Sequence, residues 1–364
     1  MISFFPDVYP DELAYSLFAR YGVRSGYTHY RAIADDLFTS HTAKPNLEFI
    51  IELSQDAYRA ITSIMPFERF ILNHTMFPYY ARFLPVERRQ KALEHLMNMD
   101  KRFNDSLYVR RNKTQHRQWL RYCPLCAEAD RERYGETYWH RLHQLDHIDI
   151  CPVHGCYLHD SSVSITSKDS PSLIHAETVI PVRSDTENCS NKIELEIAKY
   201  VSQVFSADLI IDTPATVGAF MHSKMENTKY LSARGKARLL TPLTKDFNEL
   251  YFMLPNATIK EQWQIEKIFS NHRCHTYDVC LLAFFLGVPA AELVAMELPE
   301  KTQAQLFDEK IIILHDLGFN YRQISIQMGA SYDYCKLVGN RKLKKNTGRD
   351  TSQSQSKVRN EVLL

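Results

Sequence analysis

Hydrophobic residues recur with helical spacing along the first hundred residues of the chain. Leu13, Leu17 and Tyr21 stand four residues apart, which places them on one face of a helix that starts near Pro10. Similar apolar stripes, or prolines suited to a first helical turn, predict helices at three further places: residues 30–38, after Pro66 and after Pro85. We interpret the leucines and aromatic residues of this region as a hydrophobic core.

The pattern is less uniform in the second half of the chain. Residues 161–188 are rich in Ser, Thr, Asp and Pro with weak periodicity, which predicts irregular or edge-strand structure. Residues 193–205 predict one helix. Residues 259–296 predict two helices, the second of them buried because it is rich in Leu and Phe. From Thr347 the sequence is polar and predicts a disordered tail.

Residues 307–340 have the boundary residues of a helix-turn-helix. Helices are predicted over 308–317, 321–328 and 332–338, with a glycine or a capping residue at the boundaries. Major-groove readers place their base contacts near the start of the last helix, so the candidate base-reading residues are Tyr332, Tyr334 and Lys336. The basic residues that follow are candidate phosphate contacts: Arg341, Lys342, Lys344 and Lys345. The alternative is an ordinary helical hairpin in a bundle.

The net charge of the whole chain is close to zero, but the charges are distributed unevenly along the sequence. The 364 residues carry 44 Lys and Arg against 43 Asp and Glu, which excludes a uniformly basic nucleic-acid coat protein. Residues 101–122, however, hold seven basic residues against one acidic residue. Candidate phosphate contacts in this run are Arg110, Arg111, Lys113, Arg117 and Arg121. A solvated charged face is the alternative. A second, smaller basic cluster lies at residues 232–240.

Two short cysteine motifs carry the clearest chemistry. Cys123-Pro-Leu-Cys126 and Cys151-Pro-Val-His154 each let one tight turn deliver two ligands to a metal ion. Three thiolates and one imidazole fill the tetrahedral shell of Zn²⁺ and leave no position for a catalytic water, so we predict one structural zinc ion. Cys156 and His159 repeat the spacing without the proline and are the alternative ligands.

Between the motifs lie three histidines that we interpret as packing or surface residues, with a contact to the zinc ligands or to phosphate as the alternative: His140, His143 and His147.

Several other motifs are absent from the sequence. The first residues do not resemble a signal peptide, and the longest apolar stretch, 280–296, is interrupted by Pro289 and Glu292. We therefore expect a cytoplasmic protein without a membrane segment. No phosphate-binding loop, no His-Glu-x-x-His pair and no Gly-x-Ser-x-Gly turn is present, so we expect no enzymatic activity.

The motifs of the N-terminal part, over residues 1–160, resemble those of the TniQ/TnsD family. The resemblance rests on these segments: Phe5-Pro6, Pro10-Asp11-Glu12-Leu13, Ser16, Ala19-Arg20-Tyr21, residues 73–80, residues 122–126, Arg133-Tyr134-Gly135-Glu136, Trp139-His140-Arg141, residues 143–145 and residues 151–155. It implies a target-selection protein of a bacterial Tn-type transposon. Such a protein binds target DNA, or a guide-RNA complex already on it, and recruits the AAA+ regulator TnsC. It is not itself the strand-transfer enzyme.

Together, these features predict a mainly α, multi-domain helical protein with a small Cys₃His zinc-binding module and helix-turn-helix elements. We divide the chain into five parts: a TniQ-like helical domain (1–120), the zinc-binding module (121–160), a mixed linker and helical domain (161–305), the helix-turn-helix (306–346) and the polar tail (347–364).

The leading functional hypothesis is a sequence-specific DNA-binding target-site selector that recruits a TnsC-like ATPase and a transposase to an attachment site. The alternative within the same class is an adaptor that docks on a guide-RNA (Cascade) complex. Alternatives of another class are a zinc-stabilised interaction scaffold and a zinc nuclease. The expected partners are double-stranded target DNA, the ATPase and a second copy of the chain.

Overall fold

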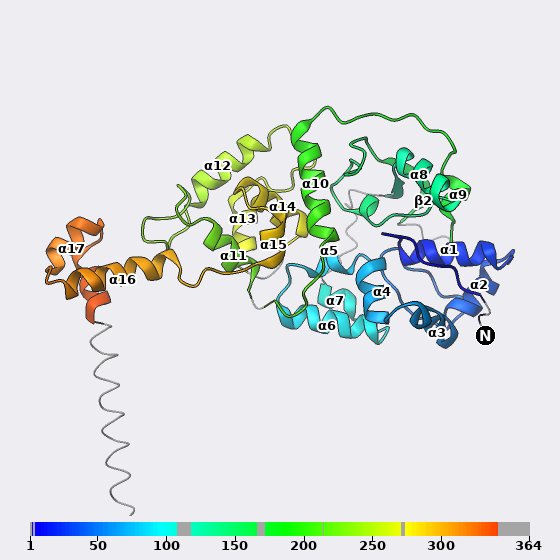
Figure 1. Ribbon diagram of the computed structural model, residues 1–364, viewed down its shortest axis with the longest axis horizontal. Coiled ribbons are helices and arrows are strands. Elements are labelled where there is room, and N and C mark those ends of the chain that lie inside the picture. Colours follow the sequence, from blue (N-terminus) through cyan, green and yellow to red (C-terminus); the bar gives the residue numbers. More distant parts are fainter. Residues whose placement is uncertain are drawn as a thin grey trace, which may run out of the picture. The chain divides into compact units, whose positions relative to one another are not determined.

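The computed structural model describes residues 2, 4–107, 118–165, 172–213, 215–270 and 274–340 (Figure 1). Over these residues the chain is mainly helical, which confirms the predicted class. The predicted tail from Thr347 lies outside the described residues, as do eight of the predicted DNA contacts: Arg110, Arg111, Lys113, Arg117, Arg341, Lys342, Lys344 and Lys345.

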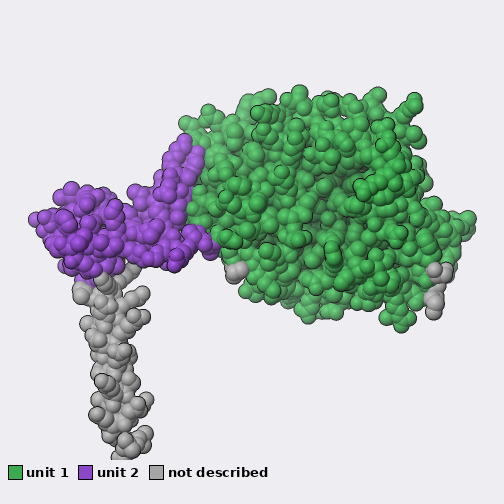
Figure 2. Space-filling view, viewed as in Figure 1, with its two compact units in different colours: residues 1–224, 240–297 green, residues 225–239, 298–364 purple. Residues whose placement is uncertain are grey.

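The chain divides into two compact units, drawn in different colours in Figure 2. Unit 1 comprises residues 1–224 and 240–297. Unit 2 comprises residues 225–239 and 298–364, so a short segment from the middle of the chain belongs with its C-terminal part. The division into two units describes which residues pack together. Whether the five predicted parts fold as separate domains stays a prediction.

Unit 1 begins with a group of short helices, as the apolar stripes and prolines predict. Their bounds are α1 Ala14–Arg24, α2 Tyr30–Leu37, α3 Gln55–Ile64, α4 Phe67–His74, α5 Phe77–Ala81, α6 Val86–Met97 and α7 Phe103–Leu107. Helix α3 was not predicted, although the hydroxyl of Ser54 caps it by accepting a hydrogen bond from the Ala57 N–H. Pro66 and Pro85 stand immediately before α4 and α6, where their fixed φ suits a helix start.

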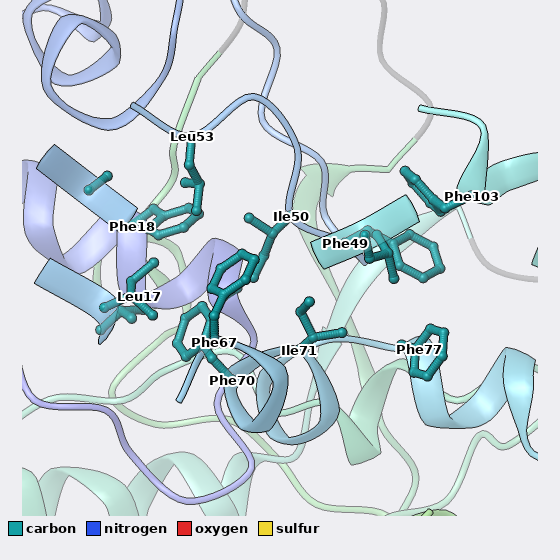
Figure 3. Packing of buried hydrophobic residues seen from close by; sticks show 14 of the residues in the cluster. Leu17, Phe18, Phe49, Ile50, Leu53, Phe67, Phe70, Ile71, Phe77 and Phe103 are labelled. Carbon is teal, nitrogen blue, oxygen red and sulfur yellow. The ribbon is translucent and has the colours of Figure 1, made fainter. Parts of the chain in front are cut away.

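These helices enclose one hydrophobic core. Figure 3 shows Leu17 and Phe18 of α1 close to Phe67 and Phe70 of α4, with Phe49 and Phe103 farther along the same cluster. All of these side chains are buried, which supports their interpretation as core residues.

A two-stranded antiparallel sheet frames the segment that contains both cysteine motifs. Strand β1 (Trp119–Tyr122) pairs with β2 (His159–Ser164), and Tyr122 stands opposite His159. Helix α8 (Pro124–Tyr134) and the 3₁₀ turn η1 (Leu142–Gln144) lie between the strands in sequence. Because the two strands pair, the two ends of the segment between them, residues 123–158, lie side by side.

The rest of unit 1 is helical. Its helices are α9 Ala176–Val179, α10 Lys192–Ser206, α11 Val217–Lys224, α12 Leu240–Leu250, α13 Gln262–Phe269, α14 Thr276–Phe285 and α15 Ala290–Ala295. Helix α10 packs against α14 and α15 (Figure 1). The prediction of two helices over 259–296 was wrong, because the described residues of this range form three. Gly287 adopts a positive φ of 71° after α14, and Pro289 caps α15, so the apolar run is broken there.

Unit 2 contains the three helices predicted for the C-terminal region: α16 (Gln303–Asp316), α17 (Tyr321–Met328) and helical residues 332–340. Helix α16 begins five residues earlier than predicted, at a capping box formed by Thr302 and Gln305. The three helices share a small core of their own, whose buried members are Ile311, Leu314, Ile324, Ala330, Cys335 and Val338.

Candidate metal centre and nucleic-acid interface

The first cysteine motif lies at the junction of β1 and α8. Cys123 is the residue before the helix, Pro124 occupies its first turn, and Cys126 follows one turn later. The Cys126 N–H points at the Cys123 sulfur at 3.5 Å. A helix N-terminus with free N–H groups favours negative charge, so this position suits a pair of thiolates.

The second motif is a tight turn closed by glycine. The Gly155 N–H donates to the Cys151 carbonyl at 2.8 Å, and Gly155 has a φ of 72°, which a side chain would strain. The turn brings Cys151 and His154 to the same side. The Cys151 N–H also donates to the Cys156 carbonyl at 2.8 Å, which holds the segment that leaves the turn.

The structure brings together all four predicted ligands. The ligand atoms of Cys123, Cys126, Cys151 and His154 lie within 4.8 Å of one another. The His154 Nδ1 is 3.5 Å, 3.3 Å and 3.7 Å from the three sulfurs, and the Cys126 and Cys151 sulfurs are 3.7 Å apart. A tetrahedral ion with Zn–S bonds of about 2.3 Å needs sulfurs roughly 3.8 Å apart. The donor set and its spacing therefore fit one metal ion.

The alternative ligands lie outside this group of four. Cys156 is buried, and its sulfur is 3.4 Å from that of Cys123. His159 lies on β2, with its ring packed edge-on against Tyr122. The three cysteines of the group are buried, whereas His154 is exposed. The side chain of His154 thus lies on the solvent side of the group.

Mutual hydrogen bonding and burial shift the pKa values of the Cys151 and Cys126 thiols in opposite directions. Hydrogen bonds from Cys123 and Cys126 hold the pKa of Cys151 well below its usual range. Hydrogen bonding with Cys123 and Cys151, followed by burial, raises the pKa of Cys126. A metal ion that binds here must displace the remaining protons, so its affinity rises with pH.

His143 is a buried neighbour of this group. Its Nε2 lies 4.0 Å from the Cys151 sulfur, and burial lowers its pKa. Its ring stands 4.7 Å from that of His140, whose Nε2 lies 2.8 Å from an Asp130 carboxylate oxygen. Burial lowers the pKa of His140, but Asp130, together with the charges of Asp11 and Cys151, outweighs burial and the net shift is upward. Both histidines are packing residues, as interpreted, and His143 also contacts a member of the cysteine cluster.

A buried ionic network joins α1 to the loop after α8. The Arg20 guanidinium donates to Glu12 at 2.9 Å and to Glu136 at 2.9 Å, and the side chains of Arg20 and Glu12 are fully buried. Arg24 also pairs with Glu136 from the surface. The Arg20 guanidinium carbon lies 3.5 Å from the centre of the Tyr9 ring. This network ties the cysteine-containing segment to the N-terminal helices.

Backbone contacts beside the network make the same connection. The Leu13 N–H donates to the Trp139 carbonyl at 2.9 Å, and the Trp139 N–H donates to the Ser16 hydroxyl at 3.1 Å. Asp11 accepts from the Arg141 guanidinium at 3.1 Å. The segments that carry the sequence resemblance thus meet in space, in roles that hold two parts of unit 1 together.

The predicted DNA contacts that the structure describes differ in their surroundings. Tyr332 and Lys336 are exposed on helical residues 332–340. Tyr334 is half-buried, and its hydroxyl donates to Asp308 of α16. Arg121 is buried, because its guanidinium pairs with Asp149 at 2.6 Å and donates to the Leu145 carbonyl at 2.7 Å. The Arg121 guanidinium is therefore engaged inside the fold, and Arg121 is not proposed as a DNA contact.

Comparison with known proteins supports the resemblance. Residues 3–158 match the TniQ family. The chain is also 32% identical over 162 residues to the transposon Tn7 transposition protein TnsD of Escherichia coli; the matched part covers 42% of this chain and 30% of that relative. Residues 3–158 of this chain are thus similar to the TniQ family and to TnsD, and the matched segment spans less than a third of that relative's length.

Among the residues that the structure describes, no helix is long and apolar enough to span a membrane.

Sequence reasoning missed the residues of the ionic network as a set. Glu12, Arg20 and Glu136 belong to the segments that resemble the family, but the contact between Arg20 and Glu136 joins positions more than a hundred residues apart. The signal available was a charged residue within an apolar helical face: Arg20 stands between Leu17 and Tyr21. A charge placed there requires a buried partner.

Proposed function

We propose that this protein selects target sites for a Tn7-type transposon as a metal-stabilised, non-catalytic DNA-binding adaptor. The observation that carries the proposal is that one chain combines a TniQ domain with a compact three-helix unit of helix-turn-helix pattern. In this proposal unit 2 reads double-stranded DNA. Unit 1 offers protein surface to a TnsC-like ATPase, which brings in the transposase.

The proposed metal is one structural Zn²⁺ held by Cys123, Cys126, Cys151 and His154. Three thiolates and an imidazole suit zinc, and a complete set of four protein ligands leaves no open position for a water nucleophile. A nuclease mechanism at this ion is therefore not proposed. The ion would close the excursion between β1 and β2, and His143 would support Cys151 from the interior.

The proposed base-reading residues are Tyr332 and Lys336, which are exposed near the start of the third helix. The basic run that follows would bind the phosphate backbone: Arg341, Lys342, Lys344 and Lys345. Phosphate contacts provide affinity that depends on salt, whereas base contacts provide sequence preference. The two sets can be separated experimentally.

We expect that replacing these four basic residues by glutamine weakens binding to duplex DNA of any sequence. Each phosphate contact contributes about −0.9 to the slope of log affinity against log salt, so losing four contacts flattens the slope by roughly 3.6. The measurement is fluorescence anisotropy of a mixed-sequence duplex, titrated at several salt concentrations.

Two further variants distinguish the proposal from its alternatives. Lys336→Ala should reduce discrimination between a duplex selected by the wild-type protein and a scrambled one by about 1–3 kcal/mol, with little change in the salt slope. If the wild-type protein binds no duplex but binds an assembled guide-RNA complex, the docking alternative replaces direct readout. If it binds neither, the scaffold alternative replaces both.

A further inference from the structure

A basic hairpin from the middle of the chain belongs to the helix-turn-helix unit. Residues 230–239 form two short arms: the Ser232 N–H donates to the Ala237 carbonyl at 2.8 Å, and the Leu239 N–H donates to the Tyr230 carbonyl at 2.7 Å. Residues 225–239 pack as part of unit 2, although α16 begins more than sixty residues later. The basic residues of the cluster at 232–240 therefore pack with the C-terminal helices of unit 2, from which they are distant in the sequence.

The tip of the hairpin packs closely on the first turn of α16. Gly235 has a φ of 69°, and a Cβ atom built there would lie 2.8 Å from the Ala304 backbone nitrogen. The Gln303 side chain donates to the Ala233 carbonyl at 3.3 Å, and the Gln303 N–H donates to Glu226 at 2.8 Å. Glycine is thus required at the tip, because a side chain would separate the hairpin from the helix.

Tyr334 fixes the basic side chains of the hairpin beside the third helix. The Arg234 guanidinium carbon and the Lys236 Nζ each lie 4.7 Å from the centre of the Tyr334 ring. The Lys236 ammonium also donates to the Tyr334 hydroxyl, and it pairs with Asp308 at 3.4 Å. A tyrosine with its ring face and hydroxyl engaged in this way is poorly placed to contact a base edge.

The hairpin and the residues just before it are rich in basic side chains. Residues 225–239 contain four basic residues, Lys229, Arg234, Lys236 and Arg238, against the single acid Glu226. Asp308 of α16 contacts both Lys236 and the Tyr334 hydroxyl. The Lys236 side chain remains 44% exposed despite these contacts, and Arg238 is exposed on the same arm.

We propose that the hairpin of residues 230–239 is a wing of the helix-turn-helix unit that contacts the phosphate backbone of duplex DNA beside the third helix, through Arg234, Lys236 and Arg238. Tyr334 acts as a positioning residue that anchors this wing. The inference deepens the proposed function and rests on it. It assigns base reading to Tyr332 and Lys336 and removes Tyr334 from that set. Duplex DNA is the partner because the hairpin cations lie beside a helix that has groove-reading form.

The experiment compares salt slopes for a mixed-sequence duplex about three helical turns long. Arg234→Gln together with Lys236→Gln should flatten the slope by about 1.8, since two phosphate contacts are lost. A fourfold increase in salt would then cost this variant about tenfold less affinity than it costs the wild-type protein. Arg234→Lys with Lys236→Arg retains both charges and should retain the wild-type slope.

A matched control removes the same charge elsewhere. Lys192→Gln with Lys199→Gln neutralises two exposed residues of α10 in unit 1 and should leave the slope unchanged. Tyr334→Ala should flatten the slope as the Gln variant does, while the Kd ratio for selected and scrambled duplexes stays at its wild-type value. Circular dichroism and the unfolding midpoint check that each variant is folded.

The outcomes separate this inference from the proposed function. Suppose that the wild-type protein binds duplex DNA with a salt-dependent Kd while Arg234→Gln with Lys236→Gln keeps the wild-type slope. That result would contradict the role of the hairpin as a wing and leave the proposed function standing. A loss of sequence discrimination in Tyr334→Ala would return Tyr334 to the base-reading set and overturn its anchoring role. If the wild-type protein binds no duplex, the proposed function fails and this inference fails with it.

Discussion

Cys151→Ser is expected to release the metal ion and to unfold the segment between β1 and β2. Zinc binding contributes roughly 10–16 kcal/mol in zinc-finger peptides, which is as large as the whole stability of a typical domain. The excursion from residue 123 to residue 158 contains one helix of 11 residues and a single 3₁₀ turn. It therefore has little regular structure with which to replace the ion. Metal content per chain, measured by atomic spectroscopy, should fall from one zinc to none.

The matched control is Cys189→Ser. Cys189 is a half-buried thiol outside the group of four, and its sulfur contacts the Asn191 carbonyl. This variant should keep one zinc and an unchanged unfolding midpoint. A strong chelator added to the wild-type protein should reproduce the loss of midpoint seen in Cys151→Ser, and Zn²⁺ should restore it. Full metal content in Cys151→Ser would contradict the ligand set, and loss of metal in Cys156→Ser alone would transfer the fourth position to that thiol.

Local signals explain what could be predicted from the sequence. Each cysteine motif spans four residues, so its turn brings two ligands together without reference to the rest of the fold. The second helix of unit 2 was predicted at its observed bounds because Asn320 caps its start and Gly329 ends it. The sequence carried the same kind of signal at Thr302 and Gln305, where α16 begins earlier than expected. Capping boxes, once recognised, locate helix starts in this protein well.

Long-range contacts explain what could not be predicted. Arg121 stands in a basic run, but it is drawn inward by Asp149 and a backbone carbonyl. Nothing in the run of charges distinguishes it from its neighbours. Likewise, Arg234 and Lys236 meet Tyr334 across about a hundred residues, so the hairpin could not be assigned to the helix-turn-helix from periodicity. Packing between segments that are distant in sequence sets the direction of the Arg121, Arg234 and Lys236 side chains. Local patterns in a single sequence do not predict that direction.

Arg20→Ala is expected to destabilise unit 1 by about 3–5 kcal/mol, because it leaves the carboxylate of Glu12 buried without its partner. Arg24→Ala is the control: Arg24 pairs with the same Glu136, but its side chain is 38% exposed, so its loss should cost less than about 1 kcal/mol. Urea unfolding can be followed by Trp139, which is fully buried beside the network, after Trp119→Phe and Trp263→Phe remove the two exposed tryptophans.

The pH dependence of Arg20→Ala provides a second, independent readout. Burial raises the pKa of Glu12 above its usual value of 4.5, and the Arg20 charge opposes that rise. Without Arg20 the folded state binds a proton on Glu12 more tightly than the unfolded state does, so stability falls as pH rises above 4.5. The deficit relative to wild type should therefore be small near pH 4.5 and large at pH 7. Glu12→Gln combined with Arg20→Met removes both charges and should recover much of the loss at pH 7. A deficit that is equal at both pH values would mean that Arg20 stabilises the fold by packing on Tyr9 rather than by neutralising Glu12.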